Sequence, residues 1–149
     1  MNQIHIAVVG LGYVGLPLSL QFARSATRVT GLDIDRRKVD ALNAGRSYIM
    51  HIESAAVQEL VAAGQFFASD DFALVREVDA IIICVPTPLS KNREPDISYI
   101  LETGKAIAPH LRAGVLVVLE STTYPGTTDE DLLRVLEAGS GLRAGTDFH

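Results

Sequence analysis

Short apolar runs alternate along this chain with longer segments in which apolar residues are spaced. The runs, which are typical of strands covered on both faces, lie at residues 4–9, 28–32, 66–69, 80–85 and 115–119. The spaced segments, which are typical of helices packed on a sheet, lie at residues 16–23, 35–44, 53–63, 97–110 and 128–138, with a helical turn at 70–75. Alternating strands and helices pair their strands in parallel through right-handed crossovers. We therefore predict an α/β, Rossmann-like, doubly wound fold, with a mainly parallel sheet and helices on both faces.

The run at residues 80–85 is the strongest strand signal, because it is continuously apolar and rich in β-branched residues. We place it in the interior of the sheet, ended by Pro86 and Pro88, which cannot donate to a strand ladder. Residues 115–119 predict a second buried strand, and residues 142–149 are expected to begin one more. No linker divides the chain, so we expect one domain over residues 1–149.

A glycine-rich loop, Gly10-Leu-Gly-Tyr-Val-Gly15, joins the first predicted strand to the first predicted helix. Such a triplet alone also fits a purely structural turn. Placed between a strand and a helix, however, it favours a dinucleotide site, because the helix N-terminus offers free N–H groups and a positive dipole end to a pyrophosphate. Gly10 permits the tight turn, Gly12 lets the backbone approach the phosphates, and Gly15 lets the helix pack closely.

Asp33 ends the second predicted strand, close to the spacing at which an acid holds an adenosine ribose. A carboxylate accepts hydrogen bonds from a free 2′-hydroxyl and repels a 2′-phosphate, so Asp33 favours NAD over NADP. Arg36, Arg37 and Lys38 would partly offset that repulsion. Asp35, the next acid, is interpreted as a helix cap.

Composition narrows the class of protein further. Among its 149 residues, 48% are hydrophobic and 21% charged, as in an ordinary globular domain, and the net charge of −5 argues against nucleic acid as a partner. No apolar run is long enough to span a membrane, and no signal peptide is recognisable, so we expect a cytoplasmic protein without a membrane partner. The histidines share no spacing with cysteines or acids, which predicts no metal site and leaves them as scattered surface or interface residues.

The single cysteine, Cys84, excludes an internal disulfide and fits a reducing compartment. Because it lies within the most apolar predicted strand, we interpret it as a small core side chain with a raised pKa rather than as a reactive thiolate.

Three separated motifs resemble the UDP-glucose/GDP-mannose dehydrogenase family: Gly10-Leu-Gly-Tyr-Val-Gly-Leu-Pro17, Val85-Pro-Thr-Pro88 and Glu120-Ser-Thr-Thr-Tyr-Pro-Gly-Thr-Thr128. The resemblance covers essentially the whole chain and matches the family's N-terminal, NAD-binding domain. The loop Leu89-Ser-Lys-Asn-Arg-Glu-Pro-Asp96 is most similar to that of the UDP-N-acetylglucosamine and UDP-N-acetylmannosamine 6-dehydrogenases. These oxidoreductases of polysaccharide biosynthesis convert the C6 alcohol of a nucleotide sugar to a carboxylate with two NAD.

The resemblance also implies roles for individual residues. The pyrophosphate would be held by Gly10, Gly12, Tyr13, Val14 and Gly15. Asp33 would hold the adenosine ribose, with Lys38 near it, and Thr87 and Ser121 would contact the cofactor. Thr122 would lie near the nicotinamide as the catalytic residue of this chain. An alternative interpretation of Thr122 is a helix cap.

The family's central helix and C-terminal domain, which carry the nucleophilic cysteine and the substrate-binding residues, have no counterpart in the sequence. The resemblance thus implies a domain that binds NAD without turnover, with a UDP-sugar as substrate of the complete enzyme and a homo-oligomer as its possible assembly. Two alternatives remain: a non-catalytic NAD-sensing or interaction module, and the cofactor domain of another Rossmann dehydrogenase of the 3-hydroxyacyl-CoA or 6-phosphogluconate type.

Overall fold

Five parallel strands form one sheet in the computed structural model, which describes residues 3–149. Their order is β3-β2-β1-β4-β5, so the strand order reverses between β1 and β4. Their bounds are β1 His5–Val9, β2 Arg28–Leu32, β3 Phe66–Ser69, β4 Ala80–Ile83 and β5 Leu116–Leu119. The prediction of a doubly wound, Rossmann-like parallel sheet is confirmed.

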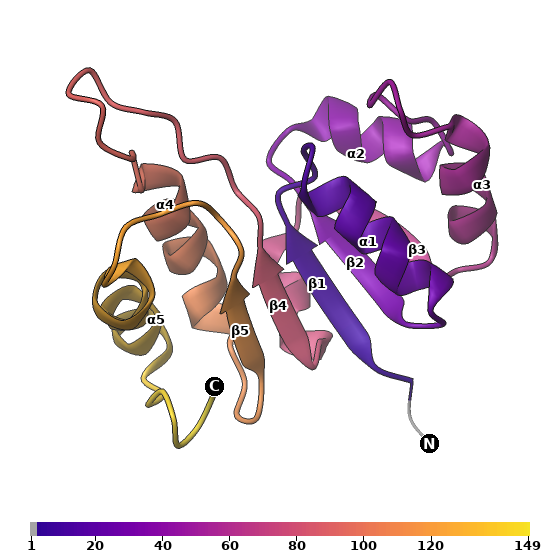
Figure 1. The fold of residues 1–149 in the computed structure, drawn as a ribbon. Helices are drawn as coiled ribbons and strands as arrows, with labels where there is room; N and C mark the ends of the chain where they lie inside the picture. The colour runs from indigo at the N-terminus through magenta and orange to yellow at the C-terminus, as the bar shows by residue number, and fades with distance from the viewer. Residues whose placement is uncertain (1–2) are drawn as a thin grey trace.

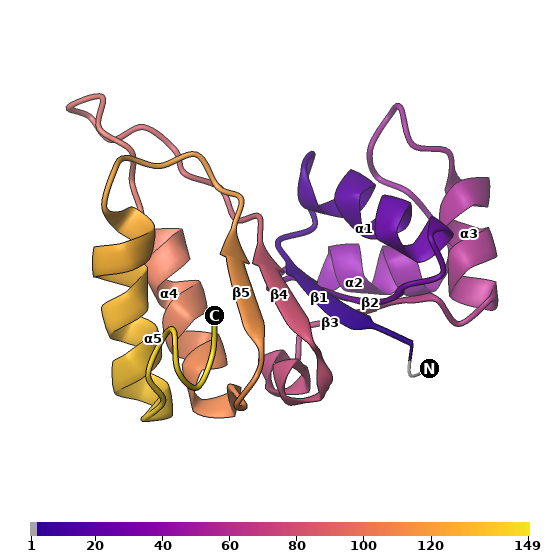
Figure 2. The same cartoon turned by 60° about the horizontal axis from the view of Figure 1, so that its bottom comes forward.

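Helices cover both faces of the sheet (Figure 1). On one side lie α1 (Gly15–Arg24), α2 (Arg36–Asn43) and α3 (Ser54–Ala62), and on the other lie α4 (Ser98–Ile107) and α5 (Leu133–Ser140). Figure 2 shows α4 and α5 side by side, outside the β4 and β5 half of the sheet. Shorter turns complete the chain as 3-10 helices η1 (Phe72–Glu77) and η2 (Ala108–His110) and as the π-helical η3 (Thr127–Leu132).

The alternation of side chains along each strand builds two separate cores. Ile6 and Val8 of β1 pack with the α1 to α3 layer, whereas Ala7 and Val9 pack with the α4 and α5 layer. All four side chains are buried. β1 is covered on both faces and paired on both edges at the centre of the sheet, and the glycine loop follows it directly.

The interpretation of residues 115–119 as a buried strand is wrong. In the described residues β5 is the edge of the sheet; Leu116 is 45% exposed, and the rest of the strand is only half-buried. The apolar composition of a strand indicates that it favours burial, but the neighbouring elements determine whether it is buried. His149 pairs with this edge, because its N–H donates to the Val115 carbonyl and its carbonyl accepts from the Val117 N–H.

Two strand and helix boundaries also differ from the prediction. β4 ends at Ile83, so Cys84 and Val85 lie beyond the strand rather than inside it. The helix expected at residues 128–138 begins one residue earlier, as the wider π-helical turn of η3, before continuing as α5. The prediction for Asp35 is confirmed, since its carboxylate accepts from the Arg37 N–H at the start of α2.

His5 is buried at the start of β1, so the prediction of a surface histidine is wrong there. Its Nδ1 lies 3.2 Å from the Glu77 carbonyl oxygen, and its Nε2 lies 2.8 Å from the Thr30 hydroxyl. A carbonyl can only accept, so Nδ1 carries the proton of the neutral ring and Nε2 accepts from Thr30. Burial and the charge of Arg28 lower the pKa of His5, against smaller opposing effects of Glu77 and Asp79.

This lowered pKa predicts a pH-dependent stability. The unfolded chain binds a proton on His5 below about pH 6.5, whereas in the folded chain His5 takes up that proton only at a lower pH. The free energy of unfolding should therefore be highest above that pH and fall as the pH drops toward the folded-state pKa. Urea unfolding followed by circular dichroism should show this slope in the unchanged chain and a smaller slope in His5→Gln. His51→Gln, at an exposed histidine, is the control, and an equal slope in both variants would contradict the prediction.

Candidate functional site

The three glycines of the loop after β1 occupy different environments. Gly10 has a φ of +93°, and a Cβ there would lie 2.6 Å from the Cys84 carbonyl oxygen. A Cβ at Gly15 would lie 1.7 Å from the Gly10 carbonyl oxygen. At Gly12 an added Cβ would meet no atom of residues 3–149 within 4 Å. Gly10 and Gly15 are thus required by the fold, whereas Gly12 leaves open space in front of the backbone.

Free N–H groups gather at the start of α1. The Leu11 N–H donates to Asp33 and the Leu16 N–H donates to the Gly12 carbonyl, but the N–H groups of residues 12–15 between them find no acceptor within the described chain. No side chain caps this helix end, and Pro17 in its first turn carries no N–H. Four unpaired donors and the positive end of the helix dipole form a cradle that suits a pyrophosphate.

A pocket of about 1150 Å³ opens at the carboxyl ends of the strands, beside the point where the strand order reverses. The loops that follow β1, β4 and β5 all contribute to its wall, as expected for ligand sites in such sheets. Of the predicted site residues, the wall contains Gly10, Gly12, Tyr13, Val14, Asp33, Lys38, Thr87, Ser121 and Thr122. Gly15 lies behind the wall, in the contact between α1 and the loop.

Asp33 connects the end of β2 to the glycine loop. Its buried carboxylate accepts from the Leu11 N–H at 2.9 Å through Oδ2 and from the Asp35 N–H at 2.9 Å through Oδ1. The Lys38 ammonium lies 3.5 Å from Oδ2. Three partners therefore hold the carboxylate in one orientation at the pocket wall.

The basic residues after Asp33 already have acidic partners. Arg36 binds Asp70 at 2.9 Å and Asp40 at 3.1 Å, and Arg37 binds Asp35 at 3.0 Å. Neither arginine belongs to the pocket wall. Lys38 is the only cation among the described residues of that wall, whose acids are Asp33, Asp35, Asp70, Glu102 and Glu120. The structure thus offers little positive charge to offset the repulsion of a 2′-phosphate.

The loop after β5 is tied to the loop after β4. The Ser121 hydroxyl donates to the Val85 carbonyl at 2.8 Å, so the two loops form one continuous wall. Thr122 is exposed in that wall. The alternative in which Thr122 caps a helix is wrong, because η3 begins after Gly126 and no side chain caps it.

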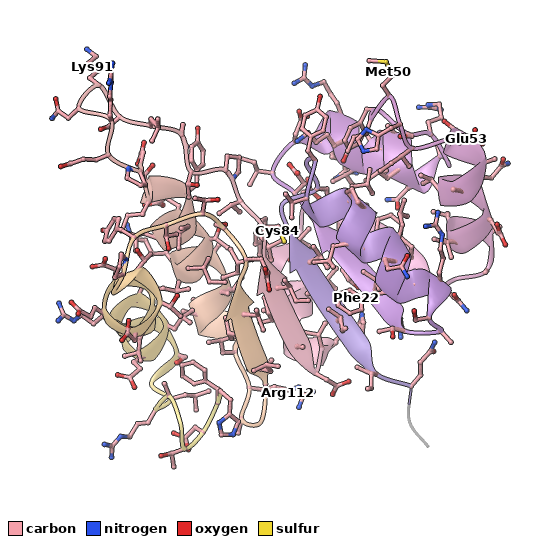
Figure 3. All side chains as sticks on the ribbon, viewed as in Figure 1. Phe22, Met50, Glu53, Cys84, Lys91 and Arg112 are labelled. Atoms are coloured by element: carbon pink, nitrogen blue, oxygen red, sulfur yellow. The ribbon has the colours of Figure 1, made fainter. Side chains whose placement is uncertain are left out.

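Cys84 also faces the pocket, at the point where β1 and β4 end (Figure 3). Burial, assisted by the negative charge of Glu120, raises the pKa of its thiol to about 11. The thiol is therefore protonated at neutral pH and unsuited to nucleophilic attack. The predicted raised pKa is borne out, but its position in the pocket wall was not expected from the apolar run.

Several wall residues were not expected from the sequence. Tyr99, Glu102, Thr103 and Ala106 lie along one face of α4, at a spacing that a helical projection of residues 97–110 would reveal. Tyr48 comes from the irregular connection between α2 and α3, which carries no periodic signal.

Neither a membrane span nor a metal cluster is present within residues 3–149. No helix there is long and apolar enough to cross a bilayer. No three or more His, Cys, Asp or Glu side chains there are grouped to hold a metal ion.

Comparisons with known proteins agree on one family. The model of the UDP-glucose/GDP-mannose dehydrogenase family, NAD binding domain, matches residues 4–149. The chain is 36% identical to a UDP-N-acetyl-D-glucosamine 6-dehydrogenase of Pseudomonas aeruginosa, over 99% of this chain and 34% of that protein. It is 39% identical to a UDP-N-acetyl-D-mannosamine dehydrogenase of Pyrococcus horikoshii, over 98% of this chain and 35% of that protein.

Solved structures give the same result. A ternary complex of GDP-mannose dehydrogenase from Pseudomonas aeruginosa superposes with a TM-score of 0.92 at 33% identity, covering 97% of this chain and 34% of that one. The UDP-D-ManNAc dehydrogenase of Pyrococcus horikoshii gives 0.90 at 38% identity, with the same coverage. The chain thus spans about a third of the length of these relatives.

The different environments of Gly12 and Gly15 predict different losses of stability from the same substitution. Gly15→Ala forces a methyl group against a backbone oxygen and should reduce the free energy of unfolding by about 1–3 kcal/mol. Gly12→Ala adds its methyl group to open space and should leave stability within about 0.5 kcal/mol of the unchanged chain. Urea unfolding of the two variants measures this, and equal losses would contradict the assignment.

Proposed function

Since the chain belongs to the UDP-glucose/GDP-mannose dehydrogenase family and is its NAD-binding domain, we propose that it serves a nucleotide-sugar 6-dehydrogenase acting on a UDP-N-acetylhexosamine. The observation that carries this proposal is the pocket into which the loops after β1, β4 and β5 converge. Relatives that act on UDP-N-acetylglucosamine and UDP-N-acetylmannosamine support the substrate class.

In the proposed complex, the free N–H groups of residues 12–15 bind the pyrophosphate, with Tyr13 and Val14 beside it and Gly10 and Gly15 shaping the loop. Asp33 accepts hydrogen bonds from the adenosine ribose, and Lys38 lies next to that carboxylate. The exposed alcohol of Thr122 faces the reacting end of the cofactor, with Thr87 and Ser121 in the adjoining wall. Bound NAD supplies a hydride acceptor for oxidation at C6.

Thr122 is the residue of this chain proposed to act near the reacting carbon. Its hydroxyl lies in the wall, free of the helix-capping role, so it can orient a water molecule or stabilise developing negative charge. Cys84 cannot serve as the acyl-accepting nucleophile, since its pKa of about 11 keeps the thiol protonated. We therefore expect the 149-residue chain to bind NAD without turning over a sugar.

A second candidate function, an NAD-responsive interaction module, is favoured by one observation. At the edge of the sheet in the described residues, β5 is only half-buried and its Leu116 is 45% exposed, so this edge can contact another apolar surface. Size-exclusion chromatography distinguishes the two: a monomer that keeps its NAD affinity favours a self-contained module, and association favours an exposed subunit or domain interface. A 3-hydroxyacyl-CoA or 6-phosphogluconate type dehydrogenase is not supported by the family match.

Cofactor selectivity gives the first test. Isothermal titration should show NAD⁺ binding and much weaker NADP⁺ binding, because Asp33 repels a 2′-phosphate and Arg36 and Arg37 are already paired. Asp33→Asn should weaken NAD⁺ binding about 10- to 100-fold, as expected for loss of a charged hydrogen-bond acceptor, and reduce the preference over NADP⁺.

Two further variants sharpen this titration. Gly12→Ala should weaken NAD⁺ binding while preserving the fold, because its methyl group occupies the approach to the free N–H groups. Glu102→Gln, which neutralises another carboxylate of the wall, should change the cofactor preference less than Asp33→Asn. A flat NAD⁺ titration of the unchanged, folded chain at millimolar cofactor would count decisively against the proposed function.

The absence of turnover gives the second test. With NAD⁺ and UDP-N-acetylglucosamine or UDP-N-acetylmannosamine, the chain alone should form no uronate above a no-enzyme control, because oxidation to the acid level uses an acyl-accepting nucleophile and the Cys84 thiol stays protonated. Chromatography of the nucleotide sugar measures the acid directly. Uronate formation that survives Cys84→Ser would show that another residue of this chain supplies the nucleophile.

A further inference from the structure

Tyr48 reaches the glycine loop from a distant part of the chain. It belongs to the connection between α2 and α3, whose outer end carries Met50 (Figure 3). The Tyr48 hydroxyl donates a hydrogen bond to the Leu11 carbonyl. The Lys38 ammonium lies 5.8 Å from the centre of the Tyr48 ring and 3.5 Å from Oδ2 of Asp33. The connection is thereby joined to both the loop and the acid.

Both backbone polar groups of Leu11 are hydrogen-bonded, and its side chain is packed in the core. Its N–H donates to Asp33, its carbonyl accepts from Tyr48, and its side chain is fully buried. The side chain lies over Gly31, where an added Cβ would approach it to 2.8 Å. Two hydrogen bonds and a fully buried side chain therefore fix the position of Leu11.

The Leu11 carbonyl shares a planar peptide unit with the Gly12 N–H. Because that unit is rigid, the two groups point in opposite directions, and fixing the carbonyl also fixes the N–H. The Gly12 N–H is the first of the free donors at the start of α1, and glycine at this position would otherwise permit many orientations.

We propose that Tyr48 is a positioning residue for the cofactor's pyrophosphate, which it serves by anchoring the Leu11 carbonyl and thereby aiming the Gly12 N–H into the pocket. This inference rests on the proposed function, because it concerns how the same site recognises its ligand. The role is separate from that of Asp33: the acid holds the Leu11 N–H and faces the ribose, whereas Tyr48 holds the opposite end of the residue.

The surroundings of Tyr48 suit this task. Partial burial, followed by the negative charges of Asp33 and Asp35, raises the pKa of the phenol. The hydroxyl consequently keeps its proton and remains a donor at physiological pH. The cation of Lys38 over the ring holds the side chain in place without using the hydroxyl. Removing only the hydroxyl should therefore leave the packing of the ring intact.

Tyr48→Phe tests the inference by isothermal titration with NAD⁺, ADP-ribose and adenosine. Loss of one hydrogen bond that orders the donor should weaken NAD⁺ and ADP-ribose about 3- to 10-fold. Adenosine, which lacks the pyrophosphate, should bind as it does to the unchanged chain. Tyr124→Phe is the matched control, because it also removes a hydroxyl that donates one hydrogen bond, to Asp131, and Tyr124 lies outside the pocket wall.

A second measurement does not depend on the nucleotide. In amide NMR spectra of the free chain, Tyr48→Phe should shift the Gly12 resonance strongly, while the Gly64 resonance, from a distant turn, stays in place. Unchanged NAD⁺ affinity in Tyr48→Phe, or an equal loss for adenosine, would overturn the positioning role while leaving the proposed function standing. Failure of the unchanged chain to bind NAD⁺ would overturn the proposed function itself.

Discussion

The hydrogen bond from the Leu11 N–H to the Asp33 carboxylate is the constraint on which the site depends. It joins the loop after β1 to the end of β2, and it satisfies a buried carboxylate that would otherwise be costly to keep charged. The bond also removes Leu11 from the set of free N–H groups, so the free donors begin at Gly12. One contact therefore sets the place of the proposed ribose acceptor and of the proposed phosphate cradle together.

Steric limits of the glycine loop act together with this bond. Gly10 lies against the backbone of Cys84, and Gly15 lies against Gly10 itself, so neither position has space for a side chain. That packing explains why a pocket forms where the strand order reverses. The helices that follow β1 and β4 lie on opposite faces of the sheet, and the glycine loop fills the space between these two strands. At Gly12, where an added Cβ would meet no described atom within 4 Å, the backbone is left uncovered at the pocket wall.

Patterns among residues close in sequence made the fold and the glycine loop predictable. Apolar runs located the strands, and the spacing from Gly10 to Asp33 indicated the βαβ unit, because each depends on residues close in sequence. The errors arose where distant neighbours decide the outcome. The run at 115–119 is as apolar as an interior strand but lies at an edge, and His5 is buried by Thr30 and Glu77 rather than by its own neighbours. Tyr48 was missed for the same reason, since its partner Leu11 lies on a different element.

Uncharged backbone groups form the proposed phosphate site, whereas the charged side chains lie in the wall around it. In the proposed complex the cradle binds an anion through backbone N–H groups, which carry no net charge and do not titrate, while the charged side chains of the surrounding wall are mainly acidic. Arg36 and Arg37 are paired with Asp35, Asp40 and Asp70, so their charges are directed away from the pocket wall. The same burial that shapes the wall keeps the Cys84 thiol protonated. In the proposed complex the phosphates are bound by backbone N–H groups, so no protein group that binds them changes its protonation state with pH.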